Sequence, residues 1–265
     1  MTQTHHLHIT ALTVFPIKGC GGLSVDRMTL DHRGPVGDRR WLVTDPDGRF
    51  LTQREHPRLA TVRPRVTDEA ITLTVPGAPS LLVPITQGDA SLEVIVWKSG
   101  CVAADQGDDA AGWFSRLLEH ECRFVWMPEE ISRPISGGGQ EAITFADGYP
   151  LLVCHEASLE ELNCHLEAPV SMNRFRANVV VRGGSPWEED RWSRLTGEGV
   201  QLEMAKPCER CKVVTVNQDT GEGGKEPLKT LASIQRDVDG VCFGQNAIHR
   251  GTSSLRVGQA LQAHL

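Results

Sequence analysis

The stretch WLVTDPDGRFLT, residues 41–52, is typical of two short strands joined by a tight turn. Pro46 presets one turn dihedral and Gly48 supplies a positive φ, so we expect a β-hairpin here. Ala70–Val75 and Ser91–Trp97 continue the pattern, because apolar and polar residues alternate in them as in half-buried strands. No long helical pattern interrupts this N-terminal region, so it predicts a β-barrel or a strongly curved sheet.

The hydrophobic period changes after this region. Between Asp108 and Glu119 the apolar residues recur three and four positions apart, which predicts an amphipathic helix. A second helix is expected to start at Ser158, which has capping-box spacing to Glu161. Pro227 is expected to open a third, short helix. Further short strands are expected at Asn178–Arg182, Val200–Met204, Lys212–Asn217 and Val257–Leu261.

Composition narrows the classes of protein. The chain has 265 residues and a mass of 29.1 kDa, which is room for two small domains. Its 27 basic and 34 acidic residues give a net charge of −7, which argues against general nucleic-acid binding. No stretch approaches the ~18 apolar residues of a membrane helix. The N-terminal sequence MTQTHHLHIT has no secretory signal pattern, so we expect a cytoplasmic protein that does not bind membranes.

Three further features of the sequence carry expectations. The eight cysteines should be thiols rather than a disulfide framework. His5, His6 and His8 should belong to a solvated tail. The loop Pro128–Gln140, which contains three consecutive glycines, is a candidate mobile segment over a site.

The segment PCERC, residues 207–211, contains the only close cysteine pair. Such a pair can be half of a zinc site, but no second C-x-x-C and no H-x₃₋₅-H supplies the other ligands. It can be a redox pair at a helix N-terminus, although here it is expected between two strands. It can also bind a cofactor metal, handle sulfur, or be two buried structural thiols. Arg210 beside Cys211 favours a thiolate, which a soft metal such as molybdenum requires.

Four basic residues stand at expected strand ends near glycine: Lys18, Arg39, Arg40 and Arg176. They could converge on a phosphate, which Arg binds with two hydrogen bonds and Lys as a point charge. The alternative is ordinary ion pairing on the surface.

Two expected turns carry polar groups. The segment FGQN, residues 243–246, is a glycine-containing turn whose amides either bind a ligand or only form the turn. The segment FADGYP, residues 145–150, contains the only tyrosine. Within it, Asp147 is a general acid, an amide-binding carboxylate or part of a plain turn.

Nine motifs, in order, resemble those of MOSC-domain proteins with an N-terminal MOSC β-barrel domain. Within that family, the resemblance is to the mitochondrial amidoxime-reducing component and its bacterial relatives. The motifs are FPIK (15–18), GDRRW (37–41), TQRE (52–55), FADGYP (145–150), EASL (156–159), FRAN (175–178), PCERC (207–211), EPLKTL (226–231) and FGQN (243–246).

The resemblance implies an α+β, mainly β fold with a few peripheral helices. Residues 1–120 would form an N-terminal β-barrel-like domain and residues 121–265 a MOSC β-barrel domain. It also implies a molybdenum cofactor, in which the dithiolene of a phosphate-bearing pyranopterin (molybdopterin) binds the metal. The protein ligand in the family carries over to Cys211. The pterin and phosphate contacts carry over to Lys18, Gly19, Arg39, Asp147, Gly148, Tyr149, Arg176, Asn178, Glu209, Arg210 and Asn246.

Three positions depart from the family pattern. Gly19 replaces a common serine, so a hydroxyl contact is lost. Ala177 replaces a proline and should change little. Glu209 replaces another common serine and brings a carboxylate near the metal, which would alter the preferred charge of the substrate.

By this resemblance the chain is an enzyme, a molybdenum-dependent oxidoreductase that removes oxygen from small N-hydroxylated compounds in a two-electron reduction. Cys211 would be the metal ligand and a catalytic residue, and Asp147 would deliver a proton. No C-x₄-C-x₂-C run of a ferredoxin domain occurs in the sequence. A separate donor is therefore expected: a ferredoxin, a flavodoxin, or a cytochrome b5-like protein with its reductase.

Two other functions stay open. MOSC domains are also fused to molybdenum cofactor sulfurases, so the chain could be a sulfur-carrier or cofactor-delivery protein without reductase activity. It could also be a folded protein with structural thiols and no cofactor.

Overall fold

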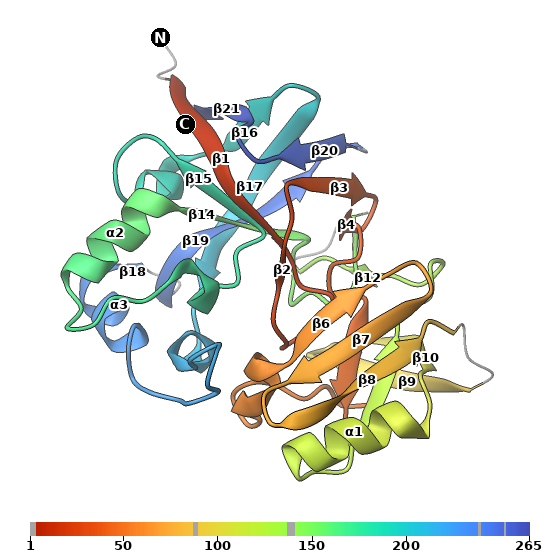
Figure 1. Ribbon diagram of the computed structural model, residues 1–265. Coiled ribbons are helices and arrows are strands. Elements are labelled where there is room, and N and C mark those ends of the chain that lie inside the picture. The colour runs from red at the N-terminus through yellow and green to blue at the C-terminus, as the bar shows by residue number, and fades with distance from the viewer. Residues whose placement is uncertain (1–3, 87–89, 137–140, 238–239, 252) are drawn as a thin grey trace.

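The computed structural model describes residues 4–86, 90–136, 141–237, 240–251 and 253–265. Within these ranges the chain is mainly β, with a closed seven-strand β-barrel, a half-barrel and three α-helices (Figure 1). The expected fold class is confirmed. No helix in these ranges is long and apolar enough to span a bilayer.

The closed barrel combines strands from both ends of the chain. Its order is β14 (Leu151–His155), β15 (Val179–Arg182), β1 (Thr4–Val14), β21 (Ala260–His264), β16 (Arg194–Gly197), β17 (Val200–Glu209) and β19 (Gly240–His249). β14 pairs with β15 on one side and with β19 on the other, which closes the ring. β1 therefore lies beside the last strand of the chain, β21 (Figure 1).

Alternation in β1 explains why this strand belongs to the barrel. Leu7 and Ile9 are buried in the core, while His6 and His8 between and around them are exposed. The expectation of a solvated histidine tail is therefore wrong. Apolar residues at every second position form a strand with one buried face, and this strand pairs with β21 from its first residue.

The half-barrel forms the other part of the molecule. Its four-stranded sheet has the order β5 (Trp41–Thr44), β11 (Arg123–Trp126), β10 (Ser99–Asp105) and β9 (Ser91–Val96). A three-stranded sheet contains β6 (Arg63–Val66), β7 (Ala70–Val75) and β8 (Ala78–Pro84). Helix α1 (Asp108–Leu118) covers this core with the apolar face expected from the sequence, since Trp113, Phe114 and Leu117 are buried.

Shorter elements connect these parts. The strands are β2 (Leu23–Ser24), β3 (Arg27–Asp31), β4 (Gly34–Pro35), β12 (Arg133–Pro134), β13 (Ala142–Ile143), β18 (Arg236–Asp237) and β20 (Ser253–Arg256). The helices are α2 (Glu156–Cys164) and α3 (Leu228–Ile234). The 3₁₀-helices are η1 (Pro57–Thr61), η2 (Met172–Arg174), η3 (Glu188–Arg191) and η4 (Lys212–Thr215).

The turn that follows β5 is formed as expected. Gly48 has φ +80°, and the Asp45 amide donates to the Arg49 carbonyl at 2.9 Å. A Cβ at Gly48 would lie 2.0 Å from the Glu93 carbonyl oxygen, so glycine is required for the close approach as well as for the dihedral. The returning strand is reduced to a single bridge between Thr44 and Phe50.

Two local expectations are wrong. The strand expected at residues 212–217 is absent from the structure. Lys212–Thr215 form η4 instead, and the Thr215 hydroxyl donates to the Lys212 carbonyl at 2.8 Å and closes a tight turn. Residues 243–246 lie inside β19 rather than in a turn. Gly244, with φ +75°, lets β19 pass close to β14, where a Cβ would lie 2.6 Å from the Val153 carbonyl oxygen.

The start of α2 also differs. The helix begins at Glu156, and Ser158 is a buried residue of its first turn rather than its cap. The Ser158 hydroxyl donates to Glu189 at 2.7 Å and accepts from the Trp187 amide at 2.8 Å. Ser158 therefore fastens α2 to η3, a tertiary role that local spacing cannot reveal.

The candidate mobile loop, residues 128–140, is described only up to residue 136, and its glycines lie outside the described residues. The buried Arg33 donates to the carbonyls of Pro128 and Ile131, both at 3.1 Å. The described part is thus anchored. The division of the chain near residue 120 stays a prediction, and the barrel itself contains β1 from the N-terminal side.

Candidate functional site

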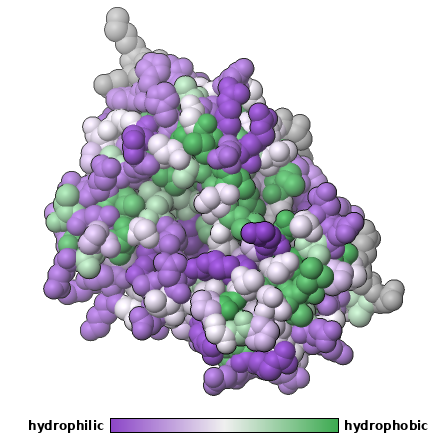
Figure 2. Space-filling model, viewed as in Figure 1, coloured by the Kyte–Doolittle hydropathy of each residue, from purple (hydrophilic) through white to green (hydrophobic). Residues whose placement is uncertain are grey.

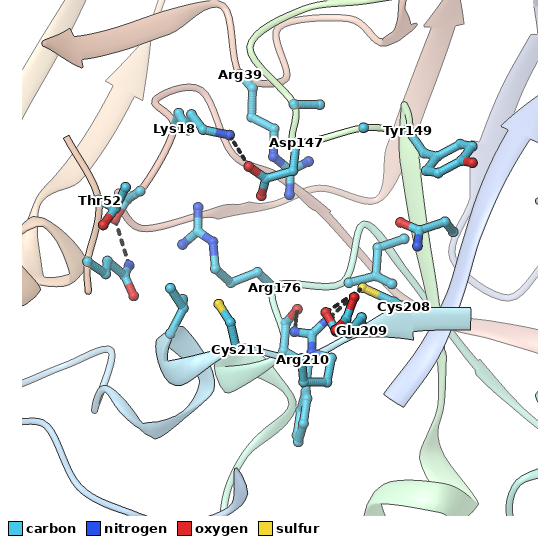
Figure 3. A pocket seen from close by; sticks show the side chains of 18 of the residues that line it. Lys18, Arg39, Thr52, Asp147, Tyr149, Arg176, Cys208, Glu209, Arg210 and Cys211 are labelled. Carbon is cyan, nitrogen blue, oxygen red and sulfur yellow. Dashed lines mark hydrogen bonds and ion pairs between the residues drawn. The ribbon is translucent and has the colours of Figure 1, made fainter. Parts of the chain in front are cut away.

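A cavity of about 540 Å³ collects the site residues expected from the sequence. The residues carried over from the family line it: Lys18, Gly19, Arg39, Asp147, Gly148, Tyr149, Arg176, Asn178, Glu209, Arg210, Cys211 and Asn246. Arg40, the fourth cation expected to converge on a phosphate, does not line it and pairs with Glu129 at 2.9 Å instead. In Figure 3, Lys18, Arg39 and Asp147 lie on one side, the two cysteines lie opposite, and Arg176 projects between them. Figure 2 shows strongly hydrophilic residues within the depression between the barrel and the half-barrel.

The backbone aims two arginines at the cavity. Arg39 and Arg176 both have left-handed backbones, with φ +48° and +58°. Both guanidinium groups lie over the ring of Phe15, at 5.0 and 4.3 Å from its centroid. Left-handed conformations are uncommon for non-glycine residues and concentrate at functional sites, so the pair marks this wall of the cavity.

Asn178 organises this wall from behind. It is almost fully buried, and its amide nitrogen donates to the Thr13 carbonyl and to Asp38, at 3.1 and 3.0 Å. Its amide oxygen accepts from the Leu152 amide and from Arg39, at 3.2 and 3.1 Å. These bonds use the hydrogen-bonding capacity of the amide. The geometry therefore favours a role for Asn178 in positioning Arg39 over direct contact with a ligand.

Asp38 and Arg39 form an ion pair within this network. The buried Asp38 carboxylate also accepts from the Phe15 amide at 2.8 Å. Asp38 thus balances Arg39 and fixes its direction. Asp38 was not singled out from the sequence, although its place directly before Arg39 was a usable signal.

Arg176 is balanced differently. Its guanidinium donates to the Cys20 carbonyl at 2.6 Å, and no carboxylate pairs with it among the described residues. Burial and the neighbouring charge of Arg39 lower the pKa of Arg176 to about 10, so it stays charged at neutral pH. A half-buried cation without an ion-pair partner at a cavity wall favours an anionic ligand.

Lys18 and Asp147 form an ion pair at 2.6 Å on the same side. Lys18 also donates to the Phe145 carbonyl at 2.9 Å, and the Trp97 indole donates to Asp147 at 2.8 Å. Burial lowers the pKa of Lys18. Burial alone would raise the pKa of Asp147, but the charge and hydrogen bond of Lys18 outweigh it and hold that pKa well below its usual range.

This electrostatic balance bears on the expected role of Asp147. Its side chain is 73% accessible because it projects into the cavity. With a low pKa, the carboxylate is ionised at neutral pH and accepts hydrogen bonds from Lys18 and Trp97. Proton delivery by Asp147 stays a prediction, and it requires that the carboxylate first receive a proton.

Sequence reasoning missed the aromatic side of the cavity. Trp97 stands in the β9–β10 turn with φ +58°, and Phe50 meets it edge-on at 4.9 Å. The Arg54 guanidinium lies over the Trp97 ring at 4.5 Å. Arg54 belongs to the TQRE motif, which was noted without a role. The buried Gln53 of the same motif donates to the Gly19 carbonyl at 2.6 Å and thereby supports that loop.

The cysteine pair lies where β17 ends and η4 begins. Cys211 precedes η4, and its exposed side chain points into the cavity in Figure 3. The Arg210 guanidinium donates to the Cys208 sulfur at 2.9 Å and to the Phe175 carbonyl at 2.6 Å. Burial would lower the pKa of Arg210, but Cys208 and the other nearby sulfurs raise it. Arg210 therefore supports mainly Cys208, not its neighbour Cys211 as expected.

Other expected contacts take simple structural roles. A Cβ at Gly148 would lie 2.3 Å from the Ser136 hydroxyl oxygen, so glycine permits a close approach there. The Asn246 amide donates to the Pro207 carbonyl at 3.3 Å and joins β19 to the cysteine segment. Glu209 is exposed. Its effect on substrate charge stays a prediction.

The thiol expectation is confirmed, since all eight cysteines lie in the described ranges and are free. Within those ranges, no group of three or more His, Cys, Asp or Glu side chains is arranged to bind a metal ion.

Two family models match the chain. The MOSC N-terminal beta barrel domain matches residues 6–121, and the MOSC domain matches residues 140–262. Mitochondrial amidoxime-reducing component 1 of Mus musculus is 36% identical over 243 residues, covering 86% of this chain and 71% of that protein. The chain belongs to the MOSC-domain family.

Two further relatives differ in their names. Mitochondrial amidoxime reducing component 2 of Bos taurus is 33% identical, covering 86% of this chain and 72% of that protein. Molybdenum cofactor sulfurase of Oryza sativa subsp. japonica is 30% identical, covering 90% of this chain but 32% of that protein. This MOSC chain is thus similar both to amidoxime-reducing components and to a part of a molybdenum cofactor sulfurase.

Residues from both regions that the MOSC family models match line the cavity. Lys18, Arg39 and Trp97 come from the region that matches the N-terminal model. Arg176 and Cys211 come from the region that matches the MOSC domain. Neither matched region alone supplies the whole set of side chains in this MOSC protein.

Proposed function

We propose that the protein is a molybdenum-cofactor-dependent reductase of small N-hydroxylated compounds that works with a separate electron donor protein. The observation that carries this proposal is a free thiol, Cys211, that points into the same cavity as Arg176, a half-buried cation without an ion-pair partner among the described residues. The similarity to amidoxime-reducing components covers most of the chain and supports the choice of reaction.

The residues present fit the cofactor. A volume of about 540 Å³ lies within the range of small-molecule sites and suits a pterin that carries a phosphate. Arg176 lacks a counter-ion among the described residues, and a phosphate would supply one. Lys18 and Arg39 already have carboxylate partners, so they contribute less unbalanced charge.

Cys211 fits as the metal ligand. Molybdenum is a soft metal that binds thiolate sulfur, and the accessible Cys211 side chain is the thiol that faces the cavity in Figure 3. When bound there, the cofactor would supply the two-electron chemistry of the reaction. Cys208, bonded to Arg210, would keep its own sulfur away from the metal.

The chain's own residues would orient the ligand and manage protons. Arg39 is fixed by Asp38 and Asn178, so it presents a preorganised cation. The Lys18–Asp147 pair holds its proton on the Lys18 amine, next to the cavity. Asp147, acting as an acceptor, would receive a proton before passing it on.

The reaction balances as R–NHOH + 2e⁻ + 2H⁺ → R–NH₂ + H₂O. The N–O bond breaks, an N–H bond forms, and the oxygen leaves as water. The electrons come from the donor, for which a ferredoxin, a flavodoxin or a cytochrome b5-like protein with its reductase is the proposal. A cytoplasmic location and independence from membranes and nucleic acid stay predictions.

The test compares the wild type with Cys211→Ala, both made in a host that synthesises the cofactor. Wild type should contain near one molybdenum per chain by metal mass spectrometry and should reduce benzamidoxime with a reduced dye. Cys211→Ala should lose most of the metal and the activity, while Cys164→Ala, which alters another exposed thiol, should retain both. Retained activity in Cys211→Ala would sink the assignment.

A sulfur-carrier or cofactor-delivery role is the second candidate. The contact between Arg210 and the Cys208 sulfur favours it, because a cation stabilises a thiolate or persulfide. The sulfurase relative supports it as well. Incubation with a cysteine desulfurase and cysteine, followed by mass spectrometry, should then find a persulfide on Cys208 or Cys211. A loaded chain that reduces benzamidoxime and acquires no persulfide argues against this candidate.

A further inference from the structure

Lysine is rare in this chain, and the lysines concentrate around the cavity. Among the 27 basic residues only six are lysines: Lys18, Lys98, Lys206, Lys212, Lys225 and Lys229. Lys18 and Lys206 line the cavity. The other four lie beside its walls without lining it, and we call Lys98, Lys212, Lys225 and Lys229 the rim lysines.

Two rim lysines adjoin cavity residues on different parts of the molecule. Lys98 follows Trp97 in the β9–β10 turn of the half-barrel. Lys212 follows Cys211 at the start of η4, beside the barrel. Because Trp97 and Cys211 line one cavity, these lysines stand at two sides of the same mouth.

The other two rim lysines extend the side that carries Cys211. Lys225 follows Gly224, whose amide donates to the Thr215 carbonyl of η4 at 3.1 Å. The Lys229 amide in turn donates to the Lys225 carbonyl at 3.1 Å, at the start of α3. These hydrogen bonds hold the segment that carries both lysines against the end of η4, the 3₁₀-helix that begins directly after Cys211.

The rim lysines are exposed, and none has an ion-pair partner in the part of the chain that the structure describes. Several exposed arginines elsewhere are paired, as Arg182 is with Glu156 and Arg256 is with Glu198. Carboxylates also occur in this region, but Glu226 accepts from the Thr230 amide at 3.0 Å and Asp219 pairs with Arg63 at 2.8 Å.

Asp147, Glu222 and Glu209 are further acids of this region. Asp147 accepts from the indole of Trp97, directly before Lys98, and pairs with Lys18. Glu222 accepts from the Thr220 hydroxyl at 3.2 Å. Glu209 belongs to the cavity lining and is exposed there. These carboxylates reduce the positive field of the rim but leave the four ammonium groups without direct partners.

The position and chemistry of the rim lysines define what they can bind. A small molecule inside the cavity meets the lining residues, so side chains outside the lining need a partner large enough to cover the mouth. Lysine ammonium groups are flexible and strongly hydrated, which suits brief electrostatic encounters better than fixed, bidentate contacts. The chain as a whole carries −7, so an acidic partner is repelled by most of the surface and attracted here.

We infer that the rim lysines are the docking surface of an acidic electron-transfer protein, which brings its redox group over the cavity next to Cys211. This inference rests on the proposed reductase function, in which each turnover takes two electrons from a donor and returns the donor oxidised. It adds the charge of that donor and the face on which it binds.

The experiment replaces all four rim lysines by glutamine: Lys98→Gln, Lys212→Gln, Lys225→Gln and Lys229→Gln. The control, Arg116→Glu with Arg194→Glu, changes the net charge by the same amount at exposed arginines of α1 and β16 that form no ion pair within the described ranges. The probe is a plant-type [2Fe–2S] ferredoxin of net negative charge. Turnover of benzamidoxime is driven either by this ferredoxin or by reduced methyl viologen, and molybdenum content is measured for each protein.

We expect kcat/KM for the ferredoxin to fall at least tenfold in the lysine variant at low salt, with methyl viologen turnover and molybdenum content unchanged. The control should keep ferredoxin turnover close to wild type, and added salt should weaken the wild-type reaction. Equal losses in variant and control, or no loss in the variant, overturn the inference.

The two proposals fail in distinguishable ways. If molybdenum-loaded wild type shows no methyl viologen turnover, the reductase function is wrong. Direct binding of the oxidised ferredoxin, measured by surface plasmon resonance at rising salt, then still tests the surface. Salt-sensitive binding that is lost in the lysine variant and kept in the control supports docking at the rim lysines. If wild type shows no salt-sensitive binding of the ferredoxin, the docking inference is wrong.

Discussion

Asn178 and Arg176 lie two positions apart, yet they relate to the cavity in opposite ways. Asn178 uses its amide entirely inside the protein, between Asp38, Arg39 and two backbone groups. Arg176 lacks a carboxylate partner among the described residues and presents its charge to the cavity. Two residues that line one cavity can therefore serve its architecture or its ligand, and their hydrogen-bond partners tell the two roles apart.

Asn178→Ala should destabilise the protein by about 2–4 kcal/mol, because several buried donors and acceptors lose their partner at once. Urea unfolding followed by circular dichroism measures this. The exposed Asn173, mutated to Ala, is the matched control and should cost less than about 1 kcal/mol. Equal effects at the two positions would contradict the positioning role.

At the scale of elements, the junction of β14, α2 and η3 contains a buried acid–base pair. His155 and Glu189 are both fully buried, with the His155 Nδ1 atom 3.6 Å from a Glu189 oxygen. Burial lowers the pKa of His155, but the charge of the nearby Glu189 carboxylate and the hydrogen bond from the His155 ring to the Gly183 carbonyl outweigh it and raise that pKa above its usual value.

This pair should make stability depend on pH. A histidine whose pKa is raised by folding contributes stability below its unfolded pKa of about 6.5, and loses it as pH rises through the folded pKa. Urea unfolding from pH 6 to 9 should show a steeper decline for wild type than for Glu189→Gln. Glu160→Gln, an exposed change on α2, should follow wild type. Parallel curves for all three proteins would refute this.

Two glycines with the same φ allow two energetic costs of a substitution to be measured separately: the cost of the left-handed backbone and the cost of steric overlap. Gly48 and Gly77 both have φ +80°, but a Cβ at Gly48 would lie 2.0 Å from the Glu93 carbonyl, whereas nothing lies within 4 Å at Gly77. Gly77→Ala should cost about 1 kcal/mol, from the left-handed conformation alone. Gly48→Ala should cost clearly more, and chemical denaturation of both variants measures the difference. A similar loss at both positions would mean that the close approach to β9 is unimportant.

Elements with a strong local signal were predictable. The amphipathic face of α1 and the period of β7 depend on neighbouring residues only, and both are found where expected. The segments at 212–217 and 243–246 were misjudged because tertiary contacts decide them. Hydrophobic, β-branched residues in η4 face a core, and Gly244 passes close to β14, neither of which a local pattern reveals.

The site shows the same division. The expected residues gather at one cavity because the motif order of a family carries long-range information. Asp38, Gln53 and Trp97 were not assigned roles, because their importance arises from contacts to residues far along the chain. The expected effect of Arg210 on Cys211 failed for a related reason, since the guanidinium lies on Cys208 instead.

At the scale of the whole molecule, the cavity joins the two matched regions, so a bound cofactor should stabilise both together. Purified holoprotein should unfold at a higher temperature than protein from a host that cannot make the cofactor. A ligand at 100 times its Kd adds about 2.7 kcal/mol. Arg176→Met should abolish most of this difference and lower the pterin content, whereas Arg116→Met should leave both unchanged. Equal holo and apo transitions in wild type would count against a ligand shared by the two parts.

The pairing of β1 with β21 has a consequence for the order of folding. Synthesis makes β21 more than 200 residues after β1, yet the barrel closes only when these two strands meet. Until then β1 has an open edge that can pair with another nascent chain. Folding should therefore be slow for the size of the protein, since its contacts join distant parts of the sequence. Until β21 is made, chaperones that bind nascent chains would have to cover the apolar residues of the open barrel and so prevent aggregation.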